Sequence, residues 1–520
     1  MAQEGAAAHQ LRYLYWRFIV LGVASLMAWN VYIVSSDFFR YEFRSTPFKD
    51  NFESMFSVLS NTINLGALCV ALYTQPKANH DRRIKRGLLA TVVSFAFVFL
   101  LPVSGVDGWA SLMAASIALC TAAIAAAYIQ CSVFGIAALL PASCAEGFMS
   151  GQAIAGTVTS AIQLVSDYLD SNASKDNRSL IKRQAETGGD SERLRLRSAA
   201  YFGLSALFMV LSTVAWEQLN GHLRKYAGGG DGYQAVSTTA TNAEESDNVT
   251  TSADEAMISS SSGGGGGSSS RNQPFAVMRE GSPRQTRDMH ACAATFQRDG
   301  GSVWATASSP TEMEELAGHG AEETEEAEDE HKLPWWLSTL GLDNARQLYT
   351  TCTETMPYIC ASAIVMGQTL AVFPPLTEAI VSSPKSSPRI SNLTSWHFLL
   401  FNVGDYLGRL STKWLVCSSH RLLHGVNGLR VLLVPAFLLF PTTATPPERA
   451  LLVHSDVLFL VLVLVLGWTN GWVATVSLIL GPRHATNKEL AGSIIGFAMC
   501  IGLVFGAVAS YPILLVAGIS

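Results

Sequence analysis

The sequence predicts an all-α protein that crosses a membrane about eleven times. Only 15% of its 520 residues are charged and 49% are hydrophobic, whereas about a quarter of the residues of a soluble protein are charged. The apolar residues gather in runs of roughly twenty, the length of helix that crosses about 30 Å of hydrocarbon. Short charged connections separate these runs. This pattern is typical of a polytopic membrane protein and argues against a globular core.

The apolar runs set the expected spans. These cover residues 13–36, 53–74, 87–106, 109–136, 143–166, 199–219, 346–372, 394–416, 427–441, 455–479 and 490–516. No small-residue cleavage site follows the first run, which indicates an uncleaved first span and not a signal peptide. The fourth and fifth runs are nearly continuous, and the ninth is short.

A long hydrophilic segment divides the spans into a group of six and a group of five. It contains a Ser/Gly run, Ser259–Ser270, and an acidic run, Glu312–Glu330. Such a composition buries too little apolar area to offset chain entropy. We therefore expect a six-helix membrane bundle at 1–220, a disordered cytoplasmic linker at 221–334, and a five-helix membrane bundle at 335–520.

The basic residues predict the orientation in the membrane. They collect after the even-numbered spans, at Lys77, Arg82, Arg83, Lys85 and Arg86, at Arg224 and Lys225, at Lys413, Arg421 and Arg430, and at Arg483 and Lys488. The positive-inside rule makes this side cytoplasmic, with the N-terminus on it and the C-terminus opposite. Loop 170–198 is also basic but falls on the other side. Either the remaining loops outweigh it, or a span is miscounted between residues 109 and 166.

Composition also narrows the class of protein. The net charge of −6 comes largely from the acidic run and does not indicate a nucleic-acid binder. The nine cysteines form no CxxC pair and the histidines have no metal-ligand spacing, so we expect neither a metal, nor a cofactor, nor catalytic residues. Sequons begin at Asn172, Asn177, Asn248 and Asn392. They are weak signals of glycosylation, and the first two and the last fall in expected outer loops.

The eighth span carries two opposite charges, Asp405 and Arg409. Each costs about 2.5–3.5 kcal/mol to place in a membrane on insertion scales. Their spacing of four puts them on one helix face, which Asn402 joins. Gly404 and Gly408, also four apart, allow a neighbouring helix to approach closely. Two interpretations remain: an ion pair that joins helices, or the polar wall of a cavity whose carboxylate and guanidinium bind a polyol.

Other polar residues lie within the first and fourth spans. Trp29 and Asn30 lie deep in the first span, where the indole offers a flat face for a heteroaromatic ring and the amide a donor and an acceptor. Packing in the core is the alternative for Trp29. Gln130, in the fourth span, either bonds across helices or contacts the edge of a base. The segment Met149–Gly156 is rich in small residues, which predicts close helix packing.

Taken together, these motifs resemble the equilibrative nucleoside transporters. The resemblance rests on Trp29-Asn30, on the stretch from Gln130 to Ser143, on Met149–Gln152, on the eighth-span motif from Phe401 to Arg409, and on the series Thr469-Asn470-Gly471, Gly481-Pro482-Arg483 and Glu489 to Gly492. The six-plus-five arrangement matches as well. The resemblance therefore covers nearly the whole membrane region.

The resemblance implies a major-facilitator-like bundle that moves nucleosides, sometimes nucleobases, by alternating access. Asp405 and Arg409 would contact the ribose, Trp29 would lie against the substrate, and Gln130 would reach the base. With Asn30 and Asn402, these residues form the expected substrate site. The preference for a purine or a pyrimidine base stays open.

Three functional hypotheses follow. The first is a facilitative transporter of nucleosides that performs no covalent chemistry, and we expect it in the plasma membrane, with the vacuolar or another internal membrane as the alternative. The second adds proton coupling through Asp405 or Glu146, against which the neighbouring Arg409 argues because a cation favours the charged carboxylate. The third, a receptor or scaffold without transport, leaves the polar residues within the spans unexplained.

Overall fold

The computed structural model describes residues 2–49, 51–176, 189–226, 342–382, 386, 388–415, 419–444 and 453–519. Within these residues the secondary structure is helical, apart from one isolated bridge between Ile380 and Thr442. The expected all-α architecture is confirmed. Most of the expected linker at 221–334 lies outside the described residues.

The helices before the linker begin and end at residues that explain their limits. They are α1 (Ala2–Val34), α2 (Ser36–Glu42), α3 (Phe52–Tyr73), the short η1 (Gln75–Lys77), α4 (His80–Ser104), α5 (Gly108–Leu139), α6 (Ala142–Asp176) and α8 (Gly189–Tyr226). The side chain of Asn79 caps α4 by accepting from the backbone N–H of Arg82. Gly105, in the left-handed conformation, ends α4. Pro141 follows the end of α5 and separates it from α6.

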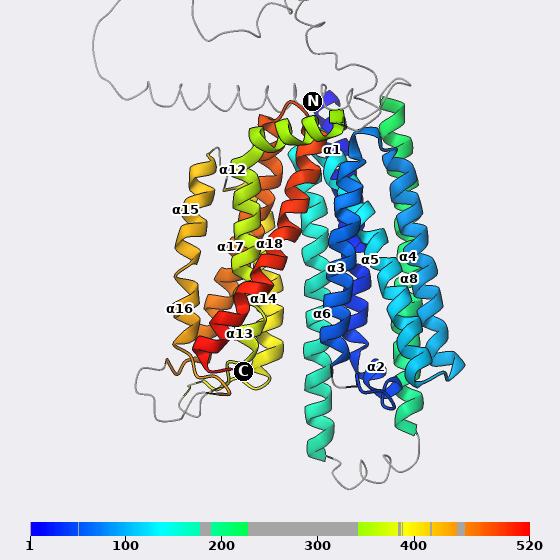
Figure 1. The fold of residues 1–520 in the computed structure, drawn as a ribbon, viewed down its shortest axis with the longest axis vertical. Coiled ribbons are helices and arrows are strands. Elements are labelled where there is room, and N and C mark those ends of the chain that lie inside the picture. Colours follow the sequence, from blue (N-terminus) through cyan, green and yellow to red (C-terminus); the bar gives the residue numbers. More distant parts are fainter. Residues whose placement is uncertain are drawn as a thin grey trace, which may run out of the picture. The chain divides into compact units, whose positions relative to one another are not determined.

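The helices after the linker are α12 (Leu342–Val372), α13 (Pro375–Glu378), α14 (Leu393–Leu410), η2 (Ser411–Lys413), α15 (His420–Arg430), α16 (Leu433–Leu438), α17 (Asp456–Leu480), η3 (Gly481–His484) and α18 (Lys488–Ala517). Side-chain caps at Ser419, Ser455 and Asn487 begin α15, α17 and α18. Figure 1 shows these helices running in alternating directions, so the links between them gather at an upper and a lower end as drawn.

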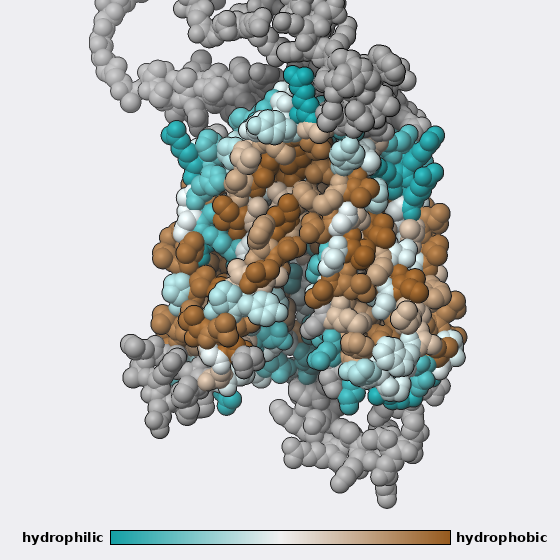
Figure 2. Space-filling model, in the orientation of Figure 1, coloured by the Kyte–Doolittle hydropathy of each residue, from teal (hydrophilic) through white to brown (hydrophobic). Residues whose placement is uncertain are grey.

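Nine segments among the described residues are long and apolar enough to cross a membrane. Figure 2 shows their hydrophobic side chains gathered in a band, with hydrophilic residues toward both ends. Leu89 and Val93 of α4 and Leu204 of α8 are exposed, which suits contact with lipid. Helices α6 and α14 match the fifth and eighth expected spans but are not among those nine.

Three expectations about boundaries were wrong. Helix α6 continues to Asp176, so the sequon at Asn172 lies in a helix and not in a loop. The ninth span begins earlier than expected, at His420, and is split into α15 and α16 after Arg430. Arg430, expected in a cytoplasmic link, is 4% exposed inside the helical bundle. The sequence alone did not reveal the burial of Arg430, because an arginine at the edge of an apolar run is normally expected to face water.

The helix limits and one ion pair at the lower end bear on the two explanations for basic loop 170–198. Helices α5 and α6 are separate, so no span was miscounted there. Arg195 of α8 donates to buried Glu42 at 2.9 Å, which places the start of α8 beside the link that follows α1. Burial raises the pKa of the Glu42 carboxyl, and the bond from Arg195 opposes this. Arg195, near the start of α8, therefore pairs with an acid at the lower end.

Glycines allow two pairs of helices to touch through their backbones. A Cβ on Gly22 of α1 would lie 2.1 Å from the carbonyl oxygen of Phe148, and one on Gly151 of α6 would lie 2.1 Å from that of Ile19. A Cβ on Gly408 of α14 would lie 2.0 Å from the carbonyl oxygen of Trp468 in α17. Any larger residue would force these helices apart, so the close packing expected at Gly404, Gly408 and Met149–Gly156 is confirmed.

Candidate substrate site

Asp405 and Arg409 form a buried ion pair on one face of α14. Their exposed fractions are 4% and 6%, and Arg409 contacts Asp405 Oδ2 through Nε at 2.8 Å and through Nη2 at 2.7 Å. The second carboxylate oxygen accepts from Asn470 Nδ2 of α17 at 2.7 Å. The remaining Nη1 of Arg409 donates to the carbonyl oxygen of Met149 in α6. Protein groups therefore occupy both carboxylate oxygens and connect α14 to two neighbouring helices.

Behind this pair, a polar network continues through α17 and α12 to Arg430. Thr369 donates to Asn470 Oδ1 at 2.8 Å, and Arg430 Nη2 donates to Thr369 at 2.6 Å. Arg430 also donates to the carbonyl oxygen of Leu466 at 2.9 Å and to Gln368 at 3.3 Å. Sequence analysis missed Arg430. The signal that could have found it is a charged side chain within a run of otherwise apolar residues, four positions before Val434.

We expect Arg430→Met to lower the stability of the protein by about 3 kcal/mol. The change removes a charged donor from Thr369 and leaves the half-buried Gln368 Oε1 without its arginine partner. The apparent melting temperature of the purified protein in detergent measures this. Arg421→Met, at an exposed position of the same helix α15, is the matched control and should leave the melting temperature unchanged. Equal melting temperatures for both variants would contradict the structural role of Arg430.

Asn402 lies one turn before Asp405 and faces α6. Its amide donates to Ser160 Oγ at 2.9 Å and to its own helix at the Phe398 carbonyl, also at 2.9 Å. Gly156 of α6 makes room for it, since a Cβ there would lie 2.3 Å from Asn402 Oδ1. The three predicted residues of α14 thus share one face, and that face packs against α6.

Helix α6 also contacts α1, which carries Trp29 and Asn30. The two helices run parallel, because the carbonyl oxygens of Tyr15 and Ile19 face Gly147 and Gly151. Ten residues beyond Ile19 this register puts Trp29 near the depth of Ser160, the residue bonded to Asn402. Trp29 is half-buried. Asn30 is half-buried too, and its amide donates to the Leu26 carbonyl of its own helix at 3.0 Å.

Gln130 lies on α5, one turn before Phe134. The Phe134 ring contacts Phe148 of α6, with ring centroids 5.0 Å apart, and its carbonyl oxygen faces Gly492 of α18. Gln130 is 8% exposed. Phe148 directly precedes Met149, whose carbonyl oxygen accepts from Arg409. Gln130 therefore lies near the depth of this Arg409 contact within the bundle. The predicted residues therefore belong to helices α1, α5 and α14, and α6 contacts all three.

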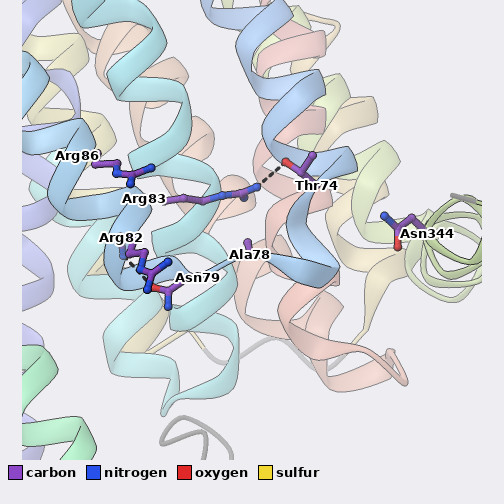
Figure 3. Close-up of a pocket in the computed structure, with 7 residues that line it drawn as sticks. All are labelled: Thr74, Ala78, Asn79, Arg82, Arg83, Arg86 and Asn344. Carbon is purple, nitrogen blue, oxygen red and sulfur yellow. Dashed lines mark hydrogen bonds between the residues drawn. The ribbon is translucent and has the colours of Figure 1, made fainter. Parts of the chain in front are cut away.

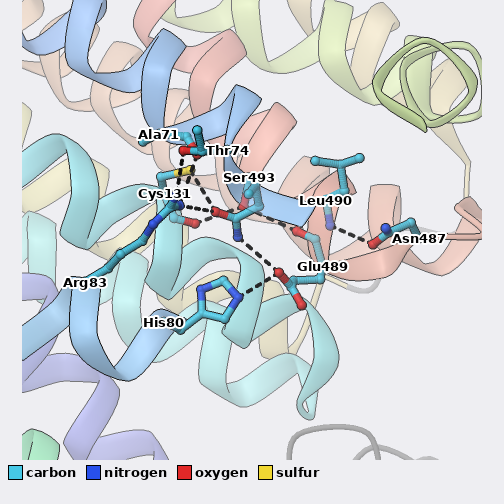
Figure 4. A network of polar contacts seen from close by, with 10 residues as sticks. Ala71, Thr74, His80, Arg83, Cys131, Asn487, Glu489, Leu490 and Ser493 are labelled. Atoms are coloured by element: carbon cyan, nitrogen blue, oxygen red, sulfur yellow. Dashed lines mark hydrogen bonds and ion pairs between the residues drawn. The ribbon is translucent and has the colours of Figure 1, made fainter. Parts of the chain in front are cut away.

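At the upper end, a second polar network joins helices from before and after the linker. Glu489 of α18 accepts from Gln75 at 3.2 Å and lies 2.7 Å from His80 Nε2 of α4. Arg83 contacts Thr74 (Figure 3) and donates to Gln75 Oε1 at 3.0 Å. Figure 4 shows His80, Arg83 and Glu489 lying close to Cys131 and Ser493. We call Gln75, His80, Arg83 and Glu489 the upper latch.

Further polar contacts join helices near the upper end. Ser493 of α18 donates to the Cys131 carbonyl of α5 at 2.9 Å. Gly135 leaves the space, since a Cβ there would lie 2.7 Å from Gln75 Nε2 and 3.0 Å from both Glu489 Cγ and Ser493 Oγ. Buried Glu146 at the start of α6 pairs with Lys413, just after α14, at 3.1 Å. Sequence analysis did not foresee the latch, because Glu489 lies more than 400 positions from the other three members.

Comparisons with known proteins agree with this architecture. A family model described as nucleoside transporter matches residues 115–276 and 293–515, more than half of the chain. Equilibrative nucleoside transporter 2 of Rattus norvegicus is 32% identical over 157 residues, 28% of this chain and 34% of that protein. Equilibrative nucleoside transporter 1 of Homo sapiens is 30% identical over 157 residues, 28% of this chain and 32% of that protein. These alignments span about a third of the relatives' length.

A solved structure resembles the fold. It is the major facilitator superfamily proton:xylose symporter XylE bound to 6-bromo-6-deoxy-D-glucose, with a TM-score of 0.50 and 9% identity. The alignment covers 98% of this chain and 89% of that one. At this identity the likeness concerns the fold alone, and the expected major-facilitator-like arrangement is confirmed.

Proposed function

This chain belongs to the nucleoside transporter family, and we propose on that basis that it carries nucleosides across a membrane by alternating access. The observation that supports the proposal best is the buried pair of Asp405 and Arg409, which faces α6. Charged groups inside a membrane are rare and usually serve transport. A transporter that only moves its substrate needs no covalent chemistry.

The pair suits the sugar of a nucleoside. A carboxylate accepts from two neighbouring hydroxyl groups, and a guanidinium donates to their oxygens. In this structure Arg409 Nη1 bonds the Met149 carbonyl and Asp405 bonds Asn470. We propose that ribose hydroxyls replace the Met149 carbonyl as the partner of Arg409 when the helices part.

We propose that the base binds on the opposite side of the same space. Trp29 offers a ring face, and Asn30 and Gln130 offer amides that can pair with the base edge. Trp29 lies near the depth of the residue that holds Asn402, and Gln130 near the depth of the Arg409 contact. This arrangement would set a nucleoside across the bundle with its sugar toward α14.

For alternating access, we propose that residues 1–220 and 335–520 move as two bundles joined by linker 221–334. The upper latch holds α18 against α3, α4 and α5, so this conformation is closed at the upper end. We place that end in the cytoplasm, because the basic links gather there. The N-terminus is then cytoplasmic, the C-terminus lies outside, and we propose the plasma membrane as the location.

We propose facilitative transport without a coupled proton. Asp405, the carboxylate within the proposed site, pairs with the cation of Arg409. A nearby cation favours the charged form of a carboxylate and disfavours proton uptake. A nucleobase remains an alternative cargo, but it lacks the hydroxyls that would bond Asp405.

Uptake of radiolabelled adenosine or uridine into cells that lack their own nucleoside transporters tests the proposal. We expect saturable uptake that stops when the inner and outer concentrations are equal and that a protonophore leaves unchanged. Accumulation beyond equality that collapses with the protonophore would indicate the proton-coupled version. Absence of uptake of either nucleoside, with the protein present at the cell surface, would overturn nucleoside transport.

A further inference from the structure

A cavity of about 320 Å³ opens at the upper end, away from α14 and the proposed nucleoside site. This volume is at the lower end of the range for ligand sites, roughly 300–1,000 Å³. Figure 3 shows Arg82, Arg83 and Arg86 of α4 on one side, with Thr74 and Asn344 opposite. Three arginines within one small cavity are unusual, because like charges repel.

The part of the cavity lining that the structure describes carries positive charge. Among the described residues that line it, none is acidic. Arg82 and Arg86 are exposed and four residues apart, an arrangement that destabilises a helix. Lys85 lies between them in sequence and does have carboxylate partners, since it pairs with Asp81 at 3.1 Å and with Glu217 at 2.8 Å. The described contacts give Arg82 and Arg86 no carboxylate partner.

The lining also comes from both groups of helices. Thr74 and the arginines belong to α3, α4 and the link between them, and Asn344 begins α12, where its amide donates to the Tyr73 carbonyl at 3.4 Å. Arg83 is shared with the upper latch through Gln75. A ligand in this cavity would therefore contact both groups of helices and favour the conformation in which they meet.

We infer that this cavity binds a phosphate-bearing anion at the membrane surface and that the bound anion stabilises the closed upper end. Guanidinium groups bind phosphate through paired hydrogen bonds. Basic pockets between membrane helices on the cytoplasmic side accept phosphorylated lipid headgroups. The same chemistry fits a free phosphate ester. Arg82 and Arg86 would supply the binding charge, and Asn79 and Thr74 neutral polar groups beside it.

Binding of phosphate-bearing probes to the purified full-length protein, inserted in phosphatidylcholine vesicles, tests this inference. The probes are phosphatidylinositol 4,5-bisphosphate within the vesicle membrane, compared with vesicles that lack it, and, in solution, inositol 1,4,5-trisphosphate and inorganic phosphate. We expect the wild-type protein to bind one or more of the phosphate-bearing probes with a raised melting temperature. The double variant Arg82→Gln/Arg86→Gln should bind roughly 10- to 30-fold more weakly. Arg421→Gln, an exposed arginine predicted on the same side, is the matched control and should bind as wild type does.

The different probes distinguish a lipid headgroup from a free phosphate as the bound anion. Preference for the phosphoinositide vesicles over both soluble probes assigns the site to a lipid headgroup, and equal binding of the soluble ester assigns it to a free phosphate. Undiminished binding by the double variant, or an equal loss in Arg421→Gln, would overturn the inference, as would absence of binding to every probe. None of these readouts depends on nucleoside transport. A failure of the proposed function would leave the result intact.

Discussion

Replacement of Asp405 by alanine is expected to reduce nucleoside uptake by about 100-fold or more. The change strips Arg409 and Asn470 of their shared partner inside the bundle, and breaking a buried ion pair costs about 3–5 kcal/mol. It also removes the acceptor that we assign to the ribose hydroxyls. Arg409→Lys should fail as well, because Arg409 uses Nε and both Nη atoms and a single ammonium cannot reproduce that fork. Initial uptake rates of labelled uridine measure both effects.

A loss of uptake from misfolding needs to be separated from a loss of binding. Asp405→Asn keeps the size of the side chain and removes only the charge, so it should fold and still fail to transport. Asp107→Ala is the matched control, since Asp107 forms an ion pair of 2.7 Å with Arg44 at the lower end, where both groups are nearly half exposed. We expect near-normal uptake from it, because such pairs contribute little. Normal uptake by Asp405→Ala at equal surface abundance would refute the site.

The positions of the helices could be predicted well from sequence patterns, because the membrane dictates the length and apolar character of each span. Apolar length, basic links and glycine spacing are local properties, and they located α5, α6 and the close approach of a helix to Gly404 and Gly408, which the structure identifies as α17. The polar face of α14 was equally accessible, since the spacing of Asp405 and Arg409 determines which way they point. What each side chain meets depends on helices distant in sequence. The contact of Arg409 with Met149 joins residues that no local pattern connects.

The ends of the helices were harder to predict for a related reason. Arg430 was assigned to water because a charge at the edge of an apolar run normally marks an interface. Its burial is made possible by Thr369 and the Leu466 carbonyl, which come from two other helices. The upper latch combines residues more than 400 positions apart in the chain. Such tertiary hydrogen bonds decide the location of a polar residue, and a single sequence does not display them.

Removal of Glu489 is expected to open the upper end. Glu489→Ala deletes the group that joins His80 and Gln75 to α18. Hydrogen bonds to a charged group contribute about 1.5–3 kcal/mol, so the open population should rise roughly tenfold or more. A buried cysteine of the chain itself can report this opening. Cys131 is 2% exposed and donates to Gln75 Oε1 at 3.4 Å, and a buried thiol reacts slowly until water reaches it.

The rate at which a membrane-impermeant thiol reagent labels Cys131 measures this opening, in a protein whose other cysteines are replaced by serine. We expect faster labelling in Glu489→Ala from the upper side only, so vesicles of both orientations also test which end is cytoplasmic. Glu217→Ala is the matched control: Glu217 pairs with Lys85 at 2.8 Å within the helices that precede the linker. Losing that pair does not free α18. If both variants label Cys131 at the wild-type rate, the latch does not hold this end closed, and the closure must come from the apolar contacts of Phe134 with Gly492 and Gly496.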